Sequence, residues 1–209
     1  IFLANEFFDA LPIKQFIKKK NKWYERYILS KNKSLQFCDI KINLSKLEKI
    51  INKKINNNLN FIEYSPLAFK KLCTISNIIT KNNGGILIID YGYNSERMFN
   101  TIQSVNKHKK NNLLANIYNS DITHMINFNY YKKEIKKMKI DSVKFTTQRE
   151  FLIKMGILER AEKISKNLPF LKKADIFYRL ERLIDKKKMG SLFKVLFATK
   201  KKNNFKLGF

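Results

Sequence analysis

Two short hydrophobic runs in the chain lead directly into polar side chains. Residues 1–4 precede Asn5 and Glu6, and residues 86–89 precede Asp90. A short apolar run bounded by polar residues is typical of a strand that is buried in a parallel sheet. In open α/β sheets the ligand crevice lies beyond the carboxyl ends of such strands. The pattern therefore predicts that Asn5, Glu6 and Asp90 line one edge of a sheet.

The apolar positions elsewhere predict a mixture of helices and strands. An aromatic and β-branched run at 23–29, between polar turns, predicts a strand, and residues 13–42 are expected to form an inserted antiparallel meander. Residues 129–188 are expected to be mainly helical, and a last strand is expected at 192–198. Helical spacing or end signals predict helices at 44–55, 66–82, 147–155, 158–167 and 172–187.

Several positions have the residue types of helix ends and turns. Ser65 can cap the helix that begins at Pro66. Thr147 and Glu150 have the spacing of a capping box. Gly92, directly after the second hydrophobic run, is expected to permit a tight turn. The helix expected at 66–82 is followed by the strand expected at 86–89, and this order indicates one helix–strand step of a doubly wound sheet.

The composition is that of a folded domain with an unusual charge. The chain has 209 residues, 44% of them hydrophobic, and a formal net charge of +26. Most of the basic residues are Lys, whereas base and phosphate recognition favours Arg. Lys, Asn, Ile, Phe and Tyr are all abundant, as in proteins from AT-rich genomes, so nucleic acid is not the expected partner. Cys38 and Cys73 suggest neither a disulfide framework nor a metal site, which favours a reducing compartment. No apolar run reaches the length of a membrane span.

The run from Ala4 to Pro12, ANEFFDALP, resembles the signature of the MidA family of S-adenosylmethionine-dependent methyltransferases. This family includes a mitochondrial complex I assembly factor that dimethylates an arginine side chain. The segment from Gly84 to Gly92 is similar to the second signature of the family. Further similarities follow in the family order at Trp23, Glu25 and Arg26, at Glu63, Ser65 and Pro66, at 101–108, at 121–128, at 147–157 and at 189–196.

Two positions depart from the family pattern. Met125 stands where the family usually has His, and Asn127 replaces an Asp. No role for that imidazole or carboxylate can be transferred to this chain. For His108 a hydrogen-bonded structural role is the simpler interpretation, and no role is assigned to His124.

The resemblance implies a class I, Rossmann-like α/β fold, with a mostly parallel sheet, helices on both faces, and an inserted antiparallel hairpin and helical segment. It implies a methyltransferase whose cofactor is S-adenosylmethionine and whose substrate is a protein arginine, with a respiratory complex I subunit as the candidate protein. Glu6 is the first candidate for binding the guanidinium. Asn5 would orient the guanidinium, and Asp9 or Asp90 would be a second carboxylate. Asp90 and Tyr91 are expected to contact the substrate. The expected location is the cytoplasm in a bacterium or the mitochondrial matrix in a eukaryote.

Simpler structural roles remain open for the same residues. Glu6 and Asp9 could merely favour the start of a helical turn through its dipole. Glu25 and Arg26 could form a cross-strand ion pair in an exposed hairpin instead of contacting substrate.

None of the six glycines forms a Gly-x-Gly arrangement, although class I methyltransferases need such a loop for the cofactor. In the family this loop precedes ANEFFDALP, so the cofactor-binding strands are expected upstream of Ile1. All 209 residues are then expected to be the carboxyl-terminal portion of a methyltransferase domain that does not bind the cofactor alone. The alternative function is a non-catalytic, protein-binding assembly factor.

Overall fold

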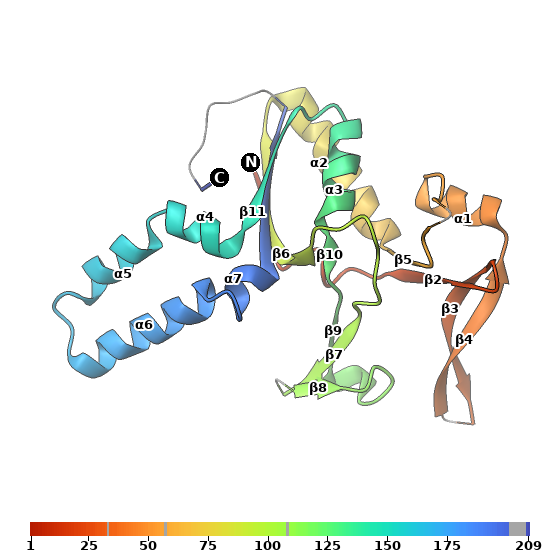
Figure 1. The fold of residues 1–209 in the computed structure, drawn as a ribbon, viewed down its shortest axis with the longest axis horizontal. Coiled ribbons are helices and arrows are strands. Elements are labelled where there is room, and N and C mark those ends of the chain that lie inside the picture. The colour runs from red at the N-terminus through yellow and green to blue at the C-terminus, as the bar shows by residue number, and fades with distance from the viewer. Residues whose placement is uncertain (33, 57, 108, 201–207) are drawn as a thin grey trace. The chain divides into compact units, whose positions relative to one another are not determined.

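The computed structural model forms two compact units that alternate along the sequence (Figure 1). The first unit comprises Ile1–Phe8, Cys73–Asn94 and Ile126–Phe209, and the second comprises Asp9–Leu72 and Ser95–Met125. The structure describes residues 1–32, 34–56, 58–107, 109–200 and 208–209. His108 lies outside these ranges, so its expected structural role stays a prediction.

The first unit contains a mixed five-stranded sheet. Its strands lie in the order β1-β6-β12-β11, and β10 pairs with the end of β6. β1 and β10 run parallel to β6, whereas β12 runs antiparallel to both β6 and β11. The expected α/β sheet is therefore present, with β12 as its one reversed strand. The strands are β1 (Phe2–Asn5), β6 (Gly85–Tyr93), β10 (Ile126–Asn127), β11 (Ser142–Thr147) and β12 (Phe193–Thr199).

Burial in the first unit follows the hydrophobic pattern of the strands. Ile86 and Ile88 on β6 are buried, as are Val195 and Leu196 on β12. These strands contribute a large share of the buried apolar surface, which is the main favourable contribution to folding. The apolar runs at 86–89 and 192–198 were therefore correctly predicted as core strands.

The helices of the first unit are α2 to α7. Thr147 and Glu150 form the predicted capping box at the start of α4. The strand β11 just before it was not predicted, because residues 129–188 were expected to be mainly helical. The helices are α2 (Pro66–Asn82), which begins in the second unit, α3 (Phe128–Lys137), α4 (Gln148–Lys154), α5 (Ile157–Ser165), α6 (Phe170–Ile184) and α7 (Met189–Leu192).

The second unit is built on a four-stranded antiparallel sheet with the order β4-β3-β2-β5. The first three strands lie in the region where a meander was expected, and β5 adds a fourth strand beside β2. Phe16, Trp23 and Ile62 are buried in this sheet. The strands are β2 (Lys14–Lys19), β3 (Lys22–Lys31), β4 (Ser34–Ile42) and β5 (Phe61–Tyr64).

Ser65 caps α2 as predicted. Its Oγ accepts a hydrogen bond from the backbone N–H of Ala68 at 3.1 Å and donates one to the carbonyl of Pro12 at 2.7 Å. The second unit also contains α1 (Leu44–Ile51), the 3-10 turn η1 (Ile117–Asn119) and a small sheet of β7 (Gln103–Asn106), β8 (Lys109–Asn111) and β9 (Asp121–Thr123). Among the residues described here, no helix is long and apolar enough to cross a membrane.

Candidate active site at the ends of β1 and β6

The sheet register brings the ends of the two hydrophobic runs together. β1 pairs in parallel with β6 so that Asn5 lies opposite Ile89. The pairing continues one residue further, because the backbone N–H of Glu6 donates to the carbonyl of Ile89 at 3.0 Å. Asp90 is the next residue of β6. Asn5, Glu6 and Asp90 therefore lie side by side where β1 ends, as the sequence predicted, although β6 continues past Asp90 to Tyr93.

Glu6 has a backbone conformation that is unusual for a residue with a side chain. Its φ is 45°, in the left-handed region, which costs roughly 1–2 kcal/mol for a residue other than glycine. Strained backbone of this kind is concentrated at functional sites, where the surrounding structure holds it in place. The Glu6 side chain is exposed. The turn therefore presents a carboxylate at the edge of the sheet.

Asp90 holds the other side of this turn. It is fully buried, and its Oδ2 accepts a hydrogen bond from the backbone N–H of Phe8 at 3.1 Å. Its Oδ1 accepts one from the backbone N–H of Tyr91 at 2.9 Å. Hydrogen bonds from backbone N–H groups to a carboxylate are among the stronger ones in proteins. Asp90 thus fixes the backbone that follows Glu6, and its predicted contact with substrate stays a prediction.

Aromatic packing anchors the same turn. The ring of Phe8 is completely buried and meets Tyr131 of α3 edge-on, with 5.4 Å between ring centroids. Phe7 packs edge-on against Phe8 at 5.1 Å, yet 41% of its surface stays exposed. Such edge-to-face pairs add stability beyond their buried area. One aromatic residue of the motif therefore anchors the turn while its neighbour faces the surface.

Tyr91 links the two strand ends through its side chain. Its hydroxyl donates a hydrogen bond to the carboxylate of Glu6 at 3.3 Å. Its ring packs against Phe193 at the start of β12, with 4.1 Å between centroids. The rigid ring thus positions a donor beside the Glu6 carboxylate. Tyr91 lies where the sequence placed it, although its contact with substrate is untested.

Gly92 does not form the tight turn that was expected. It lies inside β6, and the register places it opposite Ile126 of β10. A Cβ at this position would lie 2.5 Å from the ring of Phe128 and 2.6 Å from the carbonyl oxygen of Ile126. The glycine is needed because a neighbouring strand and a ring approach its backbone closely.

Lys194 is a polar residue at this edge that the sequence reasoning missed. It lies directly opposite Asp90 in the pairing of β12 with β6. Its ammonium group donates to the carbonyl of Ser191, and burial lowers the pKa of Lys194. Its position could not be read from the sequence, because β12 begins a hundred residues after β6 ends.

Asp9 belongs to the second unit and not to the turn described above. It is 3% exposed, and its backbone carbonyl accepts a hydrogen bond from the backbone N–H of His124 at 3.0 Å. The ring of His124 is also buried. The predicted catalytic role of Asp9 therefore stays a prediction.

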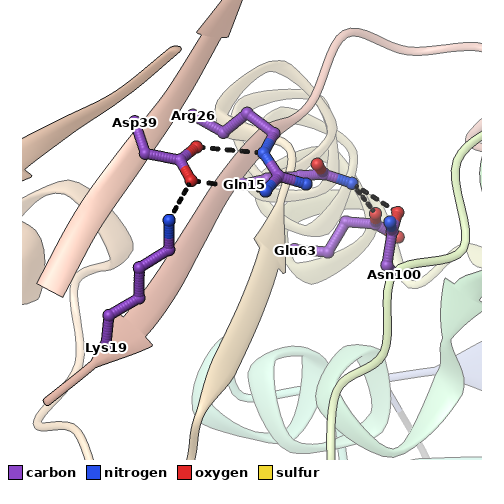
Figure 2. A network of polar contacts seen from close by, with 6 residues as sticks. All are labelled: Gln15, Lys19, Arg26, Asp39, Glu63 and Asn100. Atoms are coloured by element: carbon purple, nitrogen blue, oxygen red, sulfur yellow. Dashed lines mark hydrogen bonds and ion pairs between the residues drawn. The ribbon is translucent and has the colours of Figure 1, made fainter. Parts of the chain in front are cut away.

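A polar network ties together three segments of the second unit (Figure 2). The side-chain amide of Gln15 donates to Glu63 at 2.7 Å and to Asn100 at 2.8 Å. Glu63 also accepts hydrogen bonds from the backbone and the hydroxyl of Thr101, and that hydroxyl accepts one from the backbone N–H of Met125 at 2.8 Å. The Glu63 of the Glu-x-Ser-Pro element thus holds the 95–125 segment against the sheet of its own unit.

The charged residues of the meander form ion pairs within the sheet. Arg26 lies directly opposite Asp39 and pairs with it at 3.0 Å, and Lys19 contacts the same carboxylate at 2.8 Å. Glu25 is buried and pairs with Lys14. The ion-pair interpretation is therefore supported for Arg26 and Glu25, with Asp39 and Lys14 as the partners.

A mainly apolar cavity of about 480 Å³ lies beside these ion pairs in the second unit. It is bordered by β2, β3, β4 and the start of α2.

Among the described ranges, no cluster of three or more His, Cys, Asp or Glu side chains could hold a metal ion.

An open sheet whose parallel strands deliver polar residues to one edge is typical of α/β enzymes that bind nucleotide-like cofactors. Residues 1–146 match the family described as "Putative S-adenosyl-L-methionine-dependent methyltransferase". The chain therefore belongs to this family, and the resemblance to MidA methyltransferases is confirmed.

Named relatives and solved structures agree with this assignment. The chain is 30% identical over 167 residues to the Caenorhabditis elegans "Protein arginine methyltransferase NDUFAF7 homolog, mitochondrial", which covers 78% of this chain and 39% of the relative. It is 28% identical over 210 residues to the zebrafish (Danio rerio) NDUFAF7 protein, which covers 92% of this chain and 46% of the relative. A Burkholderia thailandensis structure bound to S-adenosyl-homocysteine has the same fold, with a TM-score of 0.77 and 22% identity over 94% of this chain and 52% of that one. The chain thus spans about half the length of the proteins it matches.

Proposed function

We propose that this chain supplies the substrate side of the active site of a protein arginine N-methyltransferase that uses S-adenosylmethionine. The observation that carries the proposal is the turn after β1, which presents Glu6 beside the end of β6. Membership of a methyltransferase family gives the reaction class. The relatives named as arginine methyltransferases suggest the acceptor.

The Glu6 carboxylate suits an arginine acceptor. A guanidinium is planar and always charged, and a carboxylate can bind it through two parallel hydrogen bonds. We assign this binding to Glu6, with Asn5 orienting the group through its amide oxygen. Asp90 holds the turn, and Tyr91 positions Glu6.

When bound, S-adenosylmethionine supplies the methyl group, and S-adenosyl-homocysteine is the by-product. One arginine nitrogen would form the new bond to the methyl carbon as the bond from that carbon to the sulfonium sulfur breaks, and the nitrogen would give up a proton to solvent. The protein's contribution is to hold that nitrogen in line with the bond that breaks and to balance the charge around it. Positioning and electrostatic stabilisation account for much of the acceleration in such transfers.

Four of the six glycines do not fit a cofactor cradle. Added Cβ atoms at Gly85, Gly92, Gly190 and Gly208 would all meet protein atoms within 3.0 Å, so these glycines serve internal packing. We propose that the chain by itself does not bind S-adenosylmethionine. Calorimetry on the chain alone is expected to show no binding, and micromolar affinity would contradict this.

One other candidate function is that of a non-catalytic assembly factor that binds a protein partner. Mass spectrometry separates the two functions. The full-length protein is incubated with a respiratory-complex subunit and a labelled methyl donor. Label on arginine supports the enzyme, whereas stable binding of the subunit without label supports the assembly factor. The relatives are named as mitochondrial proteins, so in a eukaryote we place the enzyme in mitochondria, in the matrix, and in a bacterium in the cytoplasm.

A further inference from the structure

The end of the α5–α6 hairpin exposes large apolar side chains. Figure 1 shows these two helices extending side by side away from the sheet of the first unit. At the start of α6, Phe170 is 81% exposed and Leu171 is 79% exposed. Single exposed apolar residues are common on proteins, but two adjacent large ones at the end of a projecting element need an explanation.

The exposed side chains continue along one face of α6. Phe177 and Tyr178 are 44% and 66% exposed and follow Phe170 and Leu171 by seven residues. This spacing places all four on one stripe of the helix. The stripe ends at Glu181, which a helical repeat places on the same face. The apolar surface is therefore confined to the half of α6 nearest the hairpin end.

Basic residues outnumber acidic ones around this apolar end. The segment 163–174 contains four lysines, at positions 163, 166, 172 and 173, and no carboxylate. Glu162 and Asp175 flank this segment, and Asp175 forms an ion pair with Arg179 at 3.0 Å. The end of the hairpin therefore combines an apolar surface with net positive charge.

We propose that the end of the α5–α6 hairpin binds the surface of an anionic lipid bilayer. Phe170 and Leu171 enter the boundary between headgroups and acyl chains, and the lysines stay among the anionic headgroups, as in interfacial amphipathic helices. Long lysine side chains can place their charge in water while their methylene groups contact apolar surface. The hairpin end lies on the membrane and does not cross it.

The overall charge of +26 would draw the chain to any anionic vesicle, so the test must isolate the apolar contribution. Binding to vesicles of phosphatidylglycerol and phosphatidylcholine is measured at about 0.15 M and about 0.5 M salt, because salt weakens the charge attraction but not apolar burial. The double variant Phe170→Ser/Leu171→Ser is expected to bind at least about tenfold more weakly than the wild type at the higher salt. The control Tyr118→Ser removes a ring that is 99% exposed in the second unit and is expected to change binding less than about twofold.

A second measurement reports the depth of the hairpin end directly. The Phe170→Trp variant is bound to vesicles that contain brominated acyl chains, which quench nearby tryptophan. The emission of the introduced indole is expected to be quenched, whereas the buried Trp23 of the wild type is expected to remain unquenched. Failure of the wild type to bind at the higher salt, equal loss in the control, or unquenched emission from the Phe170→Trp variant would overturn the proposal. So would sedimentation showing that the serine substitutions only abolish self-association.

Discussion

The hydroxyl of Tyr91 donates a hydrogen bond to the carboxylate of Glu6 across 3.3 Å. This contact joins the end of β6 to the turn that follows β1, 85 residues away in the sequence. The Tyr91 ring is itself held by Phe193, so the carboxylate has a defined neighbour in an otherwise exposed position. The direction of the Glu6 side chain therefore depends on three separate segments of the first unit.

Tyr91→Phe is expected to weaken methyl transfer without unfolding the protein. The substitution removes only the hydroxyl, and a hydrogen bond of this kind contributes about 1 kcal/mol, which corresponds to roughly fivefold in rate. The rate is measured with the full-length protein and a labelled methyl donor. Tyr118→Phe, which removes a hydroxyl from an exposed ring, serves as the control, and equal rates for both variants would argue against a positioning role for Tyr91.

Asp90→Asn is expected to destabilise the protein by about 2–3 kcal/mol, because a buried carboxylate that accepts two backbone hydrogen bonds is replaced by a group with one acceptor oxygen. Urea denaturation measures the free energy of unfolding. Asp121→Asn changes an exposed carboxylate at the start of β9 and is expected to have little effect. A stable Asp90→Asn protein would mean that the turn after β1 does not depend on this carboxylate.

Gly92→Ala is expected to destabilise the protein by about 1–3 kcal/mol, since the added methyl group would overlap the Phe128 ring and the Ile126 carbonyl. Gly84→Ala is the matched control, at the residue just before the same strand begins. Its added Cβ would have its nearest neighbour at 3.8 Å, an ordinary contact, so its stability is expected to stay close to that of the wild type. Thermal unfolding of the two variants distinguishes close packing from a general effect of losing glycine.

Asp39 predicts a pH dependence of stability. The hydrogen bond from Arg26, with a smaller one from Lys19, lowers the pKa of Asp39 even though burial opposes this shift. Because the folded-state pKa lies below the unfolded one, the ionised carboxylate stabilises the fold above its ordinary pKa, and this stabilisation is lost as the pH falls through the folded-state value. Asp39→Asn is therefore expected to be less stable than the wild type near neutral pH.

The comparison of Asp39→Asn with the wild type isolates this one group. Glu150 also has a lowered pKa, chiefly through the hydrogen bond from Thr146, so the acid sensitivity of the wild type alone does not identify Asp39. The two free energies of unfolding are expected to converge in strong acid. A constant difference across the pH range would show that Asp39 acts through packing instead.

The core of the site could be predicted from sequence because its two strands are local patterns. The apolar runs before Asn5 and Asp90 have the length and flanking residues of buried strands, and parallel strands place their carboxyl ends at one edge. The helix ends at Ser65 and Thr147 were also predictable, since a cap depends on residues within one turn.

The features that were missed depend on contacts between distant parts of the chain. The strands β7, β8 and β9 are short, and for these strands and for β11 the pairing partners determine whether a strand forms at all. Gly92 was interpreted as a turn because the approach of Phe128 is invisible in the sequence. The place of Lys194 opposite Asp90 depends in the same way on the antiparallel insertion of β12.

Methyl transfer by the Glu6→Gln variant of the full-length protein tests the central claim most directly. Glutamine keeps the size of the side chain but removes the charge that would bind a guanidinium. Transfer to arginine is expected to fall at least about a hundredfold, with affinity for S-adenosylmethionine unchanged by calorimetry, whereas Glu159→Gln on the exposed surface of α5 keeps full activity. Turnover by Glu6→Gln equal to that of the wild type would contradict the assignment of Glu6 to the arginine.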